Sequence, residues 1–172
     1  MRKIVFALCA ATLLPSFEAT AGQPTDFSGV WQMDLSRSDS AHQGTPIGPV
    51  TLIIREGASE LSIETRRREK DKPSAEVLLY MLDGSEKSNT GNAGGEIVTK
   101  ARWNGTKLVA ETIRDVHGAT VTTTHVLSLD ASGKELTIDK TLTVQHGYQF
   151  QGANNTGRGK DIFIKRKRLI KR

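Results

Sequence analysis

The chain has 172 residues, a single cysteine and a net charge of +5. One cysteine excludes an internal disulfide, and a thiolate metal site needs several cysteines. The length suits one domain with a substantial core and is short for two.

The N-terminal segment has the layout of a secretory signal peptide. Basic residues precede an apolar run over residues 4–14, and small residues lead up to Ala21. The apolar run is shorter than the roughly 20 residues that a membrane-spanning helix needs. We therefore expect residues 1–21 to be cleaved and residues 22–172 to form one exported domain, periplasmic or extracellular. An N-terminal anchor that is never cut is the alternative.

The only cysteine, Cys9, lies within this apolar run. The bulky Leu8 precedes it, where a lipoprotein-type cleavage site has a small residue, so lipidation is not expected. The mature domain then holds no cysteine, which excludes disulfides, thiolate ligands and a thiol nucleophile there.

The rest of the chain reads as a series of short strands. Runs of β-branched and apolar residues alternate with clusters of Gly, Asn, Asp and Ser about every 8 to 12 residues, which is typical of an antiparallel meander, sandwich or barrel. The predicted strands cover residues 30–35, 50–55, 61–65, 76–82, 97–103, 107–113, 121–129, 136–144 and 161–168.

Several segments carry more specific expectations. Asn104-Gly105 predicts a hairpin with a type I′ turn, because both residue types tolerate positive φ angles. The run 76–82 is apolar at most positions, which predicts a strand covered on both faces. Segment 85–95 has no large apolar residue and predicts an exposed loop. Segment 145–159 is expected to be loose.

Eight or nine strands joined by short turns predict an all-β domain, a single antiparallel up-and-down β-barrel. A barrel in which the last strand meets the first leaves no exposed sheet edge. Eight strands enclose an interior that can hold one small ligand.

The domain opens with a Gly-x-Trp motif, Gly29 to Trp31, on its first predicted strand. In this position the motif resembles the opening of lipocalins and of the wider calycin group. The resemblance implies that Trp31 closes the bottom of the barrel and that an Arg near the last strand packs over it. Arg166 and Arg168 are candidates for that Arg.

Four further motifs extend the resemblance over most of residues 26–144. They are Asp-Phe-Ser-Gly-x-Trp at 26–31, Asp-Leu-Ser-Arg-Ser-Asp at 34–39, Leu-Asp-Gly at 82–84 and Trp-Asn-Gly-x-Lys-Leu at 103–108. In these motifs the chain resembles uncharacterised exported bacterial lipocalin-like proteins, which implies a lipocalin-like, calycin-type barrel.

Two polar residues interrupt inward-facing apolar patterns. His125 and Lys140 are in phase with apolar neighbours on consecutive predicted strands. A buried ammonium group needs an acid, water or a ligand anion as partner. We therefore predict that these two residues hold a carboxylate head group, with an apolar wall from Trp31, Trp103, Leu127 and Leu142. A wet barrel end, or a one-residue bulge that reverses the facing, is the alternative.

Motifs for catalysis, metals and cofactors are not evident. The four histidines lack the spacing of a metal site, and no Gly-x-Ser-x-Gly occurs. The glycine-rich segment 91–95 lacks the Lys of a phosphate-binding loop. We therefore predict no catalytic residue, metal or cofactor, and a small barrel enzyme is the least favoured class.

Positive charge gathers at the C-terminal end. Residues 158–172 include eight basic residues and one acid, whereas residues 22–157 include 14 basic and 17 acidic residues. Such an end fits either a solvated surface or contact with an anionic lipid or polymer. Because no aromatic residues interleave with the basic run 165–172, nucleic acid is not an expected partner. The residues predicted for an anionic surface are Lys165, Arg166, Lys167, Arg168, Lys171 and Arg172.

These patterns favour an exported protein that binds a small apolar or amphipathic molecule inside a β-barrel. The alternative is a non-enzymatic, envelope-associated protein that docks through its basic C-terminal end.

Overall fold

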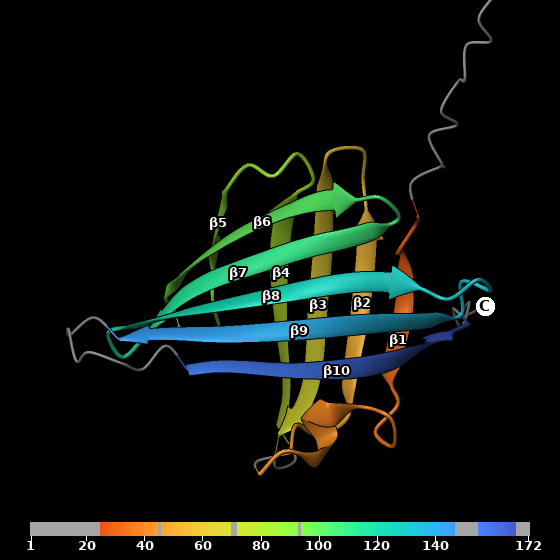
Figure 1. The fold of residues 1–172 in the computed structure, drawn as a ribbon, viewed down its shortest axis with the longest axis horizontal. Coiled ribbons are helices and arrows are strands. Elements are labelled where there is room, and N and C mark those ends of the chain that lie inside the picture. Colours follow the sequence, from red (N-terminus) through yellow and green to blue (C-terminus); the bar gives the residue numbers. More distant parts are fainter. Residues whose placement is uncertain (1–24, 45, 70–71, 93, 147–154, 168–172) are drawn as a thin grey trace, which may run out of the picture.

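The computed structural model describes residues 25–44, 46–69, 72–92, 94–146 and 155–167, so the predicted signal peptide lies outside it. These residues form a ten-stranded antiparallel sheet rolled into a nearly closed barrel (Figure 1). The strands are β1 Gly29–Met33, β2 Val50–Glu56, β3 Glu60–Glu69, β4 Lys72–Met81, β5 Lys87–Thr90, β6 Glu96–Asn104, β7 Lys107–Val116, β8 Ala119–Leu129, β9 Glu135–His146 and β10 Asn155–Arg166. A short 3-10 helix, η1, covers Asp39–His42.

Consecutive strands are neighbours in the sheet almost throughout. The exception is β4 and β5, which share no ladder. The non-consecutive strands β1 and β10 also pair, with Trp31 opposite Lys165, which confirms that the last strand meets the first. In Figure 1, β1 to β4 stand nearly upright and β6 to β10 cross in front of them. Among the described residues, no helix has the length and apolar character needed to cross a membrane.

The barrel has one seam, between β4 and β5, where no backbone ladder joins the described strands. Side chains bridge it instead. The Asn89 side chain accepts a hydrogen bond from the Leu79 N–H at 2.8 Å and donates one to the Leu79 carbonyl at 3.1 Å. The Thr99 hydroxyl donates to the same carbonyl. The barrel is therefore closed at this seam by the side chains of Asn89 and Thr99 rather than by paired main chains.

The predicted count of eight or nine strands is wrong, because β5 lies in the segment expected to be an exposed loop. Its partly buried residues, Lys87 and Asn89, are polar. Apolar alternation therefore could not reveal it. The last two strands are also longer than predicted, and of the segment expected to be loose, residues 147–154 lie outside the described residues.

Two local predictions need correction. Strand β4 is not covered on both faces, because Val77 on its outer face is 49% exposed. The β6–β7 hairpin is confirmed, but Asn104 pairs with Lys107 and only Gly105 has a positive φ, which fits a type II′ turn better than type I′. Positive φ at two successive turn residues occurs instead at His117-Gly118, between β7 and β8.

One half of the barrel is filled by a plug of large, fully buried side chains. Trp31 donates a hydrogen bond from its indole N–H to the Phe27 carbonyl at 2.9 Å. The Lys165 ammonium lies 4.9 Å from the centroid of the Trp31 ring. The plug consists of Phe27, Trp31, Ile54, Leu61, Leu108, Leu127 and Leu136.

Lys165, rather than an Arg, packs over the plug tryptophan. Inward-facing positions alternate along β10 through Asp161, Phe163 and Lys165. Arg166 consequently falls on the other face, opposite Val30, and Arg168 lies outside the described residues.

Candidate ligand-binding cavity

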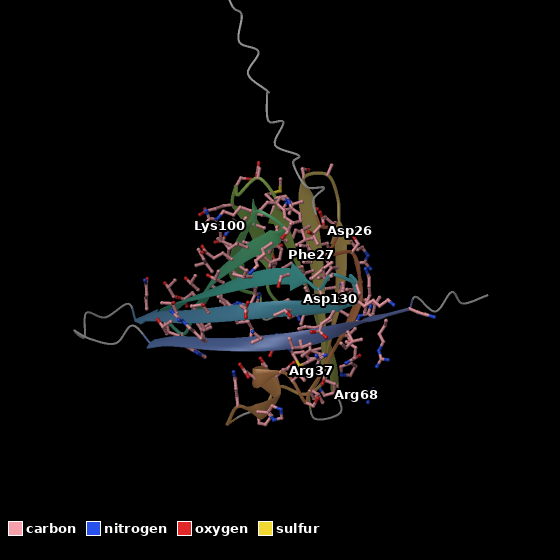
Figure 2. All side chains as sticks on the ribbon, turned by 45° about the vertical axis from the view of Figure 1, so that its right-hand side comes forward. Asp26, Phe27, Arg37, Arg68, Lys100 and Asp130 are labelled. Carbon is pink, nitrogen blue, oxygen red and sulfur yellow. The ribbon has the colours of Figure 1, made fainter. Side chains whose placement is uncertain are left out.

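The other half of the barrel is hollow. It contains a cavity of about 480 Å³, which falls within the roughly 300–1,000 Å³ typical of small-molecule sites. Leu142, which is 41% exposed, and the exposed Arg67 both line it, so its mouth lies where β3 and β9 end. Figure 2 shows Phe27, of the plug, among the strands and Arg68 at the end of the molecule where η1 lies.

The cavity wall nearest the plug is apolar. Because side chains alternate along a strand, every second residue of each strand reaches the interior. Six of the apolar side chains that line the cavity come from six different strands: Met33, Leu52, Leu78, Leu127, Ile138 and Phe163.

A neutral hydrogen-bonding pair faces the cavity from β4 and β7. The hydroxyls of Tyr80 and Thr112 lie 3.0 Å apart, and both residues are buried. Burial raises the pKa of Tyr80, so the phenol keeps its proton at neutral pH. The pair offers a ligand hydrogen bonds without charge.

An ion pair joins β9 and β10 at the cavity wall. The Lys140 ammonium is 2.6 Å from Oδ2 of the buried Asp161. The Ser40 hydroxyl donates to the same carboxylate oxygen at 2.7 Å and also contacts the Lys140 ammonium. The partner that a buried ammonium requires is therefore supplied by the protein itself.

Hydrogen bonds next to this ion pair also hold the loop that carries η1 against β10. The Ser40 N–H donates to Asp161 at 3.1 Å, and the Ser38 hydroxyl accepts a hydrogen bond from the Ile162 N–H at 2.9 Å. The Lys160 N–H donates to the Asp39 carboxylate at 2.8 Å. Since Ser40 also lines the cavity, this loop forms part of its wall.

His125 lies directly across from Lys140 on β8 and β9. Burial, followed by the positive charge of Lys140, lowers its pKa from 6.5 to about 4; Asp161 opposes the shift and Arg67 adds to it. The imidazole is therefore neutral at neutral pH.

A second ion pair lies nearer the mouth. Arg114 on β7 and Glu76 on β4 are 3.4 Å apart, and both line the cavity. Sequence reasoning missed these two residues as well as Arg67 and Asp161. Of these four residues, Arg67 could have been found from the sequence, because it lies on the same alternating, inward-facing side of β3 as Ile63.

Four of the six residues predicted as a ligand site line one cavity: His125, Leu127, Lys140 and Leu142. The two tryptophans do not line it. Trp31 is part of the plug, and Trp103 stacks on Phe27 with ring centroids 5.8 Å apart. That these residues contact a ligand stays a prediction.

The described residues of the basic C-terminal end, Lys165, Arg166 and Lys167, do not line this cavity. Lys165 contacts Trp31, while Arg166 and Lys167 are exposed. The other three residues predicted for an anionic surface fall in 168–172, outside the described residues. Within the described ranges, no group of three or more His, Cys, Asp or Glu side chains is placed to share a metal ion.

Comparison with known proteins identifies similar folds only. No protein-family model matches the sequence, and no curated protein matches it. Solved structures with a similar fold match at low sequence identity, among them the following three. A secretary abundant heat soluble (SAHS) protein from Ramazzottius varieornatus aligns with a TM-score of 0.55 and 15% identity over 86% of this chain and 100% of that chain.

The names of two further similar structures refer to lipid binding and fatty acid transport. Apo lipid binding protein 8 from Caenorhabditis elegans aligns with a TM-score of 0.53 and 12% identity, over 81% of this chain and 95% of that chain. The REP1-NXSQ fatty acid transporter aligns with a TM-score of 0.50 and 13% identity, over 81% and 96%. The likeness shows that this chain has the nearly closed, calycin-type β-barrel of these proteins.

Proposed function

We propose that this protein binds one small apolar or amphipathic molecule inside its barrel. The observation that carries the proposal is the cavity of about 480 Å³, apolar toward the plug and open at the other end. An apolar pocket with a few convergent polar groups is the usual form of a small-molecule site. Two structures of the same fold are named for lipid binding and fatty acid transport, which supports the same ligand class.

In this proposal the apolar part of the ligand contacts Leu127 and Leu142. The neutral ring of His125 and the ammonium of Lys140 contact the ligand as polar groups of the same wall. All four side chains line the cavity, from two neighbouring strands.

The proposal is tested by titrating the protein with 11-(dansylamino)undecanoic acid and following the dansyl emission. We expect saturable binding with a blue shift in the wild-type protein. Leu78→Trp, which fills the cavity, should weaken binding at least tenfold. Val77→Trp, at the neighbouring outward position, is the matched control and should bind as the wild type does. Equal binding by both variants would place the probe outside the barrel.

The proposal also includes export, with residues 1–21 acting as a cleaved signal peptide. Its support is the order of basic, apolar and small residues in that segment. Expression of the full chain followed by intact-mass measurement of the exported protein is expected to give a mature N-terminus at Gly22. Protein that retains the first 21 residues would contradict this part.

A further inference from the structure

The cavity is lined by charged groups from five strands and one histidine from a sixth. They are Arg67, Glu76, Arg114, His125, Lys140 and Asp161. Arg158 also borders the cavity, but it lies between Gly157 and Gly159, which line it too. Strand alternation therefore turns the Arg158 side chain to the outer face.

Two ion pairs cancel four of the five charges. Lys140 and Asp161 are 2.6 Å apart. Arg114 and Glu76 are 3.4 Å apart. Since the His125 ring is neutral, Arg67 is the one charged group among these described lining residues that has no opposite charge beside it.

Arg67 lies at the mouth, near the end of β3. It is opposite Val50 on β2 and Ser74 on β4, and it is exposed. Among the described residues it forms no salt bridge, whereas its neighbour Arg66 pairs with Glu64 at 2.6 Å. A guanidinium presents parallel N–H donors that match the two oxygens of a carboxylate or a similar oxyanion.

We propose that Arg67 is the specificity-determining residue of the cavity and anchors the anionic end of the ligand at the mouth. The ligand class is an amphipathic molecule with one terminal carboxylate or comparable oxyanion and an apolar body that extends toward the plug. This proposal rests on the binding function proposed above. It assigns the anion to Arg67 because the charge of Lys140 is already balanced by Asp161.

The experiment compares 11-(dansylamino)undecanoic acid with its methyl ester, which carries the same fluorophore without the charge. The wild-type protein should bind the acid about tenfold or more tightly than the ester, as expected for a hydrogen bond between charged groups. Arg67→Gln should weaken acid binding to the level of the ester and leave ester binding unchanged. Arg67→Lys should keep part of the preference.

Arg68→Gln is the matched control. It removes the same charge from the next position of β3, which faces outward, and should keep the full preference for the acid. Thermal midpoints of all variants verify that each one is folded.

Three results would overturn the proposal. Equal affinity of the wild type for acid and ester would remove the anion preference while leaving the binding function intact. An unchanged preference in Arg67→Gln, with its loss in Lys140→Met, would place the head group deep in the cavity instead. Binding of neither probe by the wild type would contradict the binding function itself.

Discussion

His125 stays neutral in the folded protein at pH values where a histidine in the unfolded chain is already protonated. Its pKa in the folded protein is about 4, because of burial and the charge of Lys140. Between pH 6.5 and 4 the unfolded chain therefore binds a proton that the folded protein does not. We expect the free energy of unfolding, measured by urea denaturation, to fall by roughly 2–3 kcal/mol from pH 7 to pH 4 through this residue.

Two variants isolate this effect. His125→Gln should flatten the pH dependence between pH 6.5 and 4, because it removes the titrating group. His117→Asn is the matched control, since His117 is exposed in a turn with a φ of 54°, which Asn tolerates. It should keep the wild-type slope. A slope that survives in His125→Gln would assign the pH dependence to other groups.

The cation that packs against the Trp31 ring is set both by side-chain charge and by position on β10. The calycin resemblance implies an Arg at this place, and the structure places Lys165 there. A Lys ammonium over an indole ring stabilises by about 0.5–2 kcal/mol, depending on how well water is excluded. The requirement is therefore a cation at an inward position of β10, and Arg166 faces the other way.

At the scale of elements, the seam between β4 and β5 depends on the side chains of Asn89 and Thr99. Asn89 bonds both the N–H and the carbonyl of Leu79, whereas Thr99 bonds the carbonyl alone. Asn89→Ala should therefore leave the partly buried Leu79 N–H without a partner, at a cost of about 1–3 kcal/mol. We expect faster hydrogen exchange at the Leu79 amide, measured by NMR, with little change at β8 and β9.

Ser88→Ala provides the comparison for this seam. Ser88 lies on the same short strand but faces outward, where its hydroxyl donates to Glu96 at 2.8 Å. The exchange rate of the Leu79 amide should be unchanged in this variant. If both variants accelerate exchange equally, β5 is held by its pairing with β6 and not by Asn89.

At the scale of the whole molecule, the barrel divides into a solid half and a hollow half. Strand β3 has one inward residue in each half: Leu61 is fully buried in the plug, and Ile63 lines the cavity. Leu61→Ala should lower the free energy of unfolding by about 2–5 kcal/mol, because it opens a void in a packed core. Ile63→Ala should cost only about 1 kcal/mol, because few packed neighbours are lost. If urea denaturation shows similar losses of unfolding free energy for the two variants, the side chains around the cavity are as well packed as those of the plug.

Strand alternation made much of the candidate site predictable. His125, Leu127, Lys140 and Leu142 follow the period-two pattern of their strands, and all four line the cavity. Asp161 was missed as the partner of Lys140, because ion pairs depend on which strands are neighbours and on their register. Strand β5 was missed because its inward contacts are hydrogen bonds rather than apolar packing.

The sequence by itself determined the all-β class, most strand positions and, on strands such as β8 and β9, the side that faces inward. These properties are local, because they follow from turn residues and from the alternation of side chains along an extended backbone. Only the tertiary structure decided which half of the barrel is filled, which charges cancel and that, among the described residues, Arg67 at the mouth has no salt-bridge partner. Those properties depend on how the strands are staggered around the barrel and where they cross, and residues far apart in the chain meet only after the barrel closes.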